Sequence, residues 1–120
     1  MFRDDRQLGA VVMALFSRFD SLQGLWGLEG YRPTELACKY HERPRTRPGW
    51  CTSAELVWRL GWDLWNQQGK TPLGELVLRL DADHLRCIGR LLVAMSQGVR
   101  GEGVDEWLRD YAPLDASRAS

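Results

Sequence analysis

The chain has 120 residues, of which 44% are hydrophobic and 27% charged, as expected for one globular domain with its own core. Its sixteen basic and sixteen acidic residues cancel, which argues against a general nucleic-acid binder, because such proteins are usually basic overall. Three cysteines are too few, and odd in number, for a disulfide framework, so we expect a cytoplasmic setting. The apolar run 8–16 lacks a signal-peptide cleavage site and is too short to span a bilayer, so it predicts core and no membrane segment.

The first predicted helix begins at Asp4 or Asp5 and runs to about Leu22. Its apolar residues alternate in spacing between four and three, forming a seam: Leu8, Val12, Leu15, Phe19 and Leu22. Because the seam is short for a coiled coil, we expect it to pack within the chain, and a dimer seam is the alternative. A turn-rich connector follows around Gly24, Gly27 and Gly30, and we expect Leu25, Trp26 and Leu28 to tuck under the core.

Thr34 is expected to cap a short helix that ends near His41. Residues 42–50 form a predicted irregular loop, since Pro44 and Pro48 exclude regular structure there. Residues 31–50 carry five basic and two acidic side chains, so this stretch is locally positive.

The central element is a predicted helix at 53–68, which holds three of the six tryptophans. Thr52 and Glu55 have capping-box spacing, and Gly69 suits a left-handed helix end. Trp58 and Trp65 lie in the middle of the apolar arc and are assigned to the core, whereas Trp62 lies at its edge. The glycine at position 61 is tolerable if another helix crosses closely there.

Three further helices are predicted after the tryptophan helix. Thr71 and Pro72 begin a short helix that ends near Leu80. Asp81 or Asp83 caps the next, which reaches about Gln97, ends at Gly98 and buries a stripe of Leu85, Ile88, Leu92 and Met95. After a turn at 99–103, a last short helix, 104–111, presents Trp107 and stops before Pro113.

No segment has the alternation of a strand, so the predicted fold is all-α. We expect a compact single-domain helical bundle over residues 1–112, with three longer helices and two or three short ones packed around the tryptophan helix. Residues 113–120 form a polar tail that we expect to be frayed.

Each histidine lies three residues from a cysteine, in the pairs Cys38 with His41 and His84 with Cys87. Such pairs share a helical face, and zinc binds these two residue types. Their order and separation match no zinc-finger spacing, so they are weak metal candidates and we expect no metal or other cofactor. The acid–base cluster Asp81, Asp83 and His84 is expected to cap a helix, so we predict no enzyme activity.

Residues 71–91 have the cadence of a helix-turn-helix segment, with Arg86 and Arg90 on the second helix. In DNA-binding examples the second helix enters the major groove. Asp81 and Asp83 stand where phosphates would approach, so two adjacent core helices are the preferred interpretation.

The cadence Leu-Val-Trp-Arg-Leu-Gly-Trp-Asp-Leu-Trp-Asn at 56–66, followed by Leu-Arg-Leu-Asp at 78–81, resembles small uncharacterised helical proteins encoded on bacterial mobile elements. The resemblance covers residues 54–111, and the N-terminal half departs from it. It implies an accessory protein encoded by a phage or mobile element, and it carries no activity to transfer.

The function predicted from these features is a protein-interaction module, an accessory or inhibitor protein that occupies a surface of a larger partner. Tryptophan and arginine are enriched at interface hot spots, and they nominate the partner-binding residues Arg43, Arg45, Arg47, Trp50, Trp62 and Trp107. We expect Trp50 with Arg45 and Arg47 to form the binding edge, and the alternative is that Trp50 folds back over the start of the tryptophan helix. The second functional hypothesis is a DNA- or RNA-binding regulator that uses residues 71–91 or the arginines at 43–47.

Overall fold

The computed structural model describes residues 5–29, 32–97 and 102–111, and over these ranges the chain is almost entirely helical. The α-helices are α1 (Asp5–Phe16), α2 (Glu35–Glu42), α3 (Thr52–Asn66), α4 (Leu73–Arg79), α5 (Ala82–Gln97) and α6 (Glu102–Tyr111). Two 3₁₀ turns, η1 (Asp20–Leu22) and η2 (Pro44–Thr46), and a two-stranded hairpin, β1 (Leu28–Glu29) with β2 (Arg32–Pro33), complete these ranges. The predicted all-α single-domain fold is therefore confirmed.

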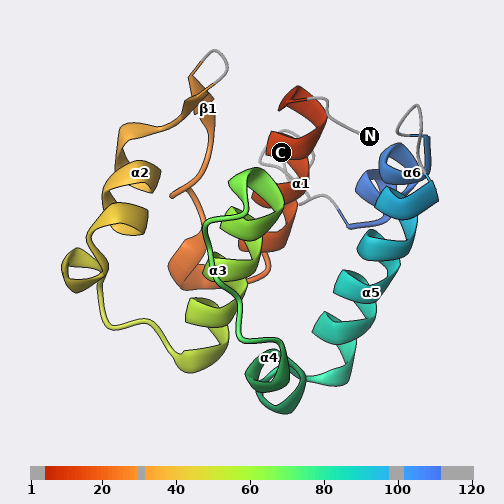
Figure 1. The fold of residues 1–120 in the computed structure, drawn as a ribbon. Helices are drawn as coiled ribbons and strands as arrows, with labels where there is room; N and C mark the ends of the chain where they lie inside the picture. Colours follow the sequence, from red (N-terminus) through yellow and green to blue (C-terminus); the bar gives the residue numbers. More distant parts are fainter. Residues whose placement is uncertain (1–4, 30–31, 98–101, 112–120) are drawn as a thin grey trace, which may run out of the picture.

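Helix α3 occupies the middle of the molecule, with α2 on one side and α5 on the other (Figure 1). Helix α1 packs against α3 and α6, α6 packs against α5, and α4 packs against α3. The predicted seam of α1 is therefore internal, since Leu8, Val12 and Leu15 are all buried within the chain.

The interior is dominated by an aromatic cluster of Phe16, Trp26, Trp58, Trp62 and Trp65. Phe16 stacks on Trp58 with ring centroids 4.8 Å apart, and the Trp26 ring meets Trp62 and Trp65 edge to face at 5.3 and 5.4 Å. A Cβ on Gly61 would lie 2.5 Å from the Phe16 ring, so the predicted close crossing at position 61 is confirmed.

The N-terminal region departs from the predicted elements in two ways. Helix α1 ends at Phe16, because Phe19 is extended and the chain turns through η1, which buries Leu22. A single continuous helix to Leu22 was therefore wrong. The hairpin was missed as well, because two paired residues per strand are too few to show a period of two.

The ends of the central helices also differ from prediction. Thr34 caps α2 as expected, by accepting a hydrogen bond from the Ala37 amide. No side chain caps α3, whose N-cap is Cys51, so the Thr52–Glu55 capping box was wrong. The left-handed residue after α3 is Gln67, with φ of 63°, and not Gly69.

Gly69 has a different role: it allows the backbone that follows α3 to pass very close to the backbone of α3 at Arg59. A Cβ at this position would lie 1.8 Å from the Arg59 carbonyl oxygen. The return is held by Asp63, whose carboxylate accepts hydrogen bonds from the Lys70 amide at 2.8 Å and from both the amide and the hydroxyl of Thr71. Thr71 therefore does not cap α4, whose N-cap is Pro72.

Helix α5 is capped by Asp81, which accepts a hydrogen bond from the His84 amide at 2.9 Å. Asp81 was one of the two predicted caps, and Asp83 was the other. Its buried face is Cys87, Ile88, Leu91 and Ala94. The predicted stripe was partly wrong, since Leu92 is exposed and Leu85 and Met95 are only partly buried. The face is rotated because α6 packs against α5 and covers Cys87 and Ala94.

Several predicted features lie outside the described residues. These are a cap at Asp4, the glycines at 30 and 98, most of the turn at 99–103, Pro113 and the tail at 113–120.

Candidate functional site

Arg47, one of the predicted binding residues, is part of the fold. Its side chain is only 7% exposed and pairs with the Glu55 carboxylate at 2.7 Å. Its Nε also donates to the Tyr40 carbonyl oxygen at 2.6 Å. Arg47 thereby ties the basic loop to α2 and α3, whereas Arg43 and Arg45 are exposed at the surface of the same loop.

Trp50 folds back over α3, which is the alternative that the sequence left open. Its ring lies 5.1 Å from that of Trp58 and 5.7 Å from that of Tyr40, with the Arg47 guanidinium 5.7 Å from its centroid. These contacts leave Trp50 partly buried, so the structure does not gather Trp50, Arg45 and Arg47 into an open binding edge.

Trp62 and Trp107 are core residues, each only 3% exposed. The expectation that Trp62 lies at an accessible edge was wrong, because the His41 ring of α2 stacks on it at 4.0 Å. Trp107 is buried between α5 and α6 and donates its indole N–H to the Cys87 carbonyl oxygen at 2.9 Å. Neither ring reaches a partner while the helices stay packed.

The two cysteine–histidine pairs lie on different helices, α2 and α5, on opposite sides of α3 (Figure 1). Burial, followed by the charge of Arg47, lowers the pKa of His41. Burial raises the pKa of the Cys38 and Cys87 thiols, which disfavours the thiolate that binds metals. Within the described ranges, no three His, Cys, Asp or Glu side chains are grouped as a metal site would require.

His84, at the start of α5, lies with its Nδ1 2.7 Å from the Asp81 carboxylate. Two hydrogen bonds lower the pKa of Asp81: the one from the His84 amide has the larger effect, and the one from the His84 ring has the smaller. One face of the same imidazole packs against the Phe19 ring, with the two ring centroids 4.8 Å apart. These contacts close the first turn of α5 and join it to the connector after α1.

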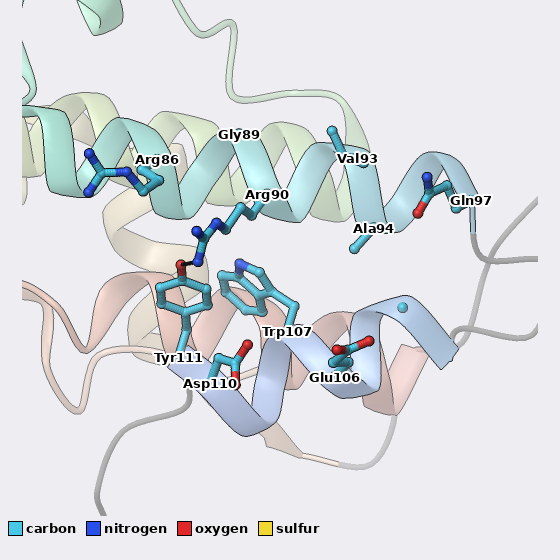
Figure 2. Close-up of a pocket in the computed structure, with 11 residues that line it drawn as sticks. Arg86, Gly89, Arg90, Val93, Ala94, Gln97, Glu106, Trp107, Asp110 and Tyr111 are labelled. Atoms are coloured by element: carbon cyan, nitrogen blue, oxygen red, sulfur yellow. Dashed lines mark hydrogen bonds between the residues drawn. The ribbon is translucent and has the colours of Figure 1, made fainter.

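Arg86 and Arg90 line an open groove of about 550 Å³ between α5 and α6 (Figure 2). Arg86 pairs with Asp83 at 3.0 Å, and Arg90 donates to the Tyr111 hydroxyl at 2.9 Å. Glu106 and Asp110 of α6 line the same groove. Two consecutive helices, α4 and α5, do occupy the predicted helix-turn-helix segment. A nucleic-acid backbone in this groove would, however, meet the carboxylates of Glu106 and Asp110, which repel phosphates.

The apolar surface that the sequence reasoning missed is on α4. Leu73, Val77 and Leu78 are 67%, 56% and 84% exposed, although α4 has only seven residues. At roughly 100° per residue, Leu73, Val77, Gly74 and Leu78 span an arc of about 140°. We call this surface the α4 arc. A helical wheel of residues 73–79 reveals it, once Leu76 is recognised as the residue that faces the core.

Comparison with protein-family models, curated proteins and solved structures finds no match to this chain. Among the described residues, none forms a helix with the length and apolar character that crossing a membrane requires.

Proposed function

We propose that this protein is an interaction module, and that the α4 arc inserts into an apolar groove of a larger partner protein. The observation that carries the proposal is the exposure of Leu73, Val77 and Leu78 on one short helix. Large apolar side chains gathered at one site are a typical mark of an interaction surface, whereas scattered ones are not.

The surroundings of the arc have the composition of an interface. Leu76 and Leu80 are buried and fix α4 to the body of the protein. Glu75 and Arg79 border the arc, and both are well exposed, with 3.9 Å between their charged groups. Apolar anchors spaced by four residues beside a polar rim are the pattern that a helix presents to a groove.

The energetics favour a surface that extends beyond α4. Complete burial of one leucine or valine contributes about 1.5–3 kcal/mol, while association itself costs at least about 4 kcal/mol. Three anchors alone therefore give weak binding. Such a module acts as an accessory or inhibitory protein by occupying a surface of its partner.

The test is a matched comparison of two variants in capture from host cells, followed by titration of the captured protein. Leu73→Ser with Leu78→Ser should weaken binding at least about tenfold, equal to 1.4 kcal/mol. Leu36→Ser, on α2, removes an exposed leucine elsewhere and should leave affinity unchanged. Both should keep the wild-type circular dichroism. Equal affinity of the double variant and wild type would exclude the α4 arc, and a steep loss of binding with salt would favour the nucleic-acid hypothesis instead.

A further inference from the structure

A second cavity, of about 560 Å³, lies between the end of α2 and the turn that follows α3. Its walls include the His41 ring, Pro44 and the Gln68 side chain, and Trp58 lines it from within the core. Arg47, Arg59 and Lys70 also line it. This volume lies within the range of small-molecule sites, about 300–1,000 Å³.

The lining of this cavity carries charge of one sign. Its three fixed charges are all cationic, and no carboxylate is among its lining residues. The groove between α5 and α6 differs, since Arg86 and Arg90 there stand beside Glu106 and Asp110. In a chain with no net charge, this local excess is a property of the site.

Two of the three cationic side chains, Arg59 and Lys70, make no ion pair or hydrogen bond with the described residues. Glu55 pairs with Arg47, so that charge is compensated. Two further acids, Glu42 and Asp63, lie near His41. The Asp63 carboxylate accepts hydrogen bonds from the Lys70 amide and from Thr71. The Arg59 guanidinium and the Lys70 ammonium have no partner among the residues that the structure describes. An anion that enters the cavity therefore meets two uncompensated charges.

Trp58 closes the cavity on the side of the core. Its side chain is 0% exposed, and its indole N–H has no acceptor within the described part of the chain, as is also the case for Trp50 and Trp62. Because protein atoms cover this N–H, it offers no donor to the cavity, and the polar groups at hand are those of the surrounding side chains.

We propose that this cavity binds a small organic oxyanion, a carboxylate or phosphate attached to a planar apolar body. Arg59 and Lys70 bind the oxyanion, and the His41 ring and Pro44 contact the apolar body. Arginine provides a planar fork for two oxygens, and lysine adds a point charge. The site is separate from the α4 arc, so it stands whether or not that arc binds a partner.

The test uses phenyl phosphate, benzoate and inorganic phosphate as probes at constant ionic strength. We expect saturable binding of phenyl phosphate and benzoate by calorimetry, together with a shift of the Gln68 side-chain amide resonances in ¹⁵N-labelled protein. Inorganic phosphate lacks the apolar body and should bind at least about tenfold more weakly. A linear response without saturation, or equal affinity for inorganic phosphate and phenyl phosphate, would overturn the proposal.

A matched pair of charge variants separates the site from general attraction. Arg59→Gln with Lys70→Gln should weaken phenyl phosphate binding at least about tenfold. Arg79→Gln with Arg109→Gln removes the same charge from exposed positions on α4 and α6 and should change it less than twofold. All four side chains are exposed, so both double variants should keep the wild-type melting temperature. Equal weakening by the two pairs would show general electrostatic attraction and refute the site.

Discussion

The aromatic cluster and the α4 arc use large apolar side chains in opposite ways. The tryptophans of the cluster are all buried, and Arg47 beside them is held by Glu55 and backbone carbonyl oxygens. On α4, plain aliphatic residues are left open to solvent. Tryptophan and arginine are common at binding hot spots, but in this region they are buried or paired within the fold. Leucine and valine side chains form the exposed apolar surface instead. Burial and pairing, rather than residue type, decide which side chains remain free to bind.

The largest expected effect comes from truncating one large side chain in each region, which tests whether the aromatic cluster stabilises the fold and the α4 arc does not. Trp58→Ala should lower the free energy of unfolding by about 3–5 kcal/mol, because it removes the centre of the aromatic cluster. Leu78→Ala, on the α4 arc, should change it by less than about 0.5 kcal/mol. Urea melts of the two variants give both values, and equal midpoints would contradict the contrast.

A smaller effect should distinguish two arginines that lie two positions apart. Arg47→Gln removes the partner of Glu55 and the donor to the Tyr40 carbonyl, so we expect a loss of about 1–3 kcal/mol. Arg45→Gln, at an exposed position of the same loop, should stay within about 0.5 kcal/mol. Denaturant unfolding of both measures the difference. Similar values would mean that Arg47 is as free as Arg45.

The smallest expected effect depends on pH and concerns the turn that precedes α4. Desolvation opposes ionisation of Asp63, but hydrogen bonds from Thr71, Lys70 and Gly69 outweigh it and lower its pKa below the ordinary 3.8. Because the unfolded chain takes up this proton first, the stabilisation is present above about pH 3.8 and is lost as the pH falls through the folded-state pKa. Asp63→Asn should therefore lower stability by about 1 kcal/mol at pH 7.

The pH series contains its own control. Thermal melts of Asp63→Asn and wild type should converge as the pH falls through the lowered folded-state pKa of Asp63, because both side chains are neutral below it. A difference that stays constant with pH would show that the carboxylate charge does not act at this turn.

Much of the fold followed from periodicity and local signals. The helices, the Thr34 cap, the core positions of Trp58 and Trp65 and the close crossing at Gly61 were predicted from spacing alone. The capping box failed because Glu55 binds Arg47, a residue from a neighbouring loop. Local pattern cannot indicate such a competitor, since the choice is made by the tertiary structure.

The candidate sites were harder to predict for the same reason. Trp62 lies at the edge of the apolar arc on a helical wheel, and only the placement of α2 brings His41 over it. The uncompensated charges of Arg59 and Lys70 become apparent only when the turn after α3 brings them together beside Trp58. The α4 arc, in contrast, lies within seven consecutive residues and was within reach of the sequence.

The return of the chain at Gly69 has a consequence for how α4 meets other molecules. Backbone at position 69 passes so closely over Arg59 that no side chain fits, and Asp63 holds the next two residues by their amides. The segment between α3 and α4 is thus held against α3 by this close approach and these hydrogen bonds. A partner that docks on the proposed α4 arc would meet anchors that are already in place, so little conformational entropy would be lost in ordering them. Association at this surface should approach rigid docking, with a rate set by encounter and orientation.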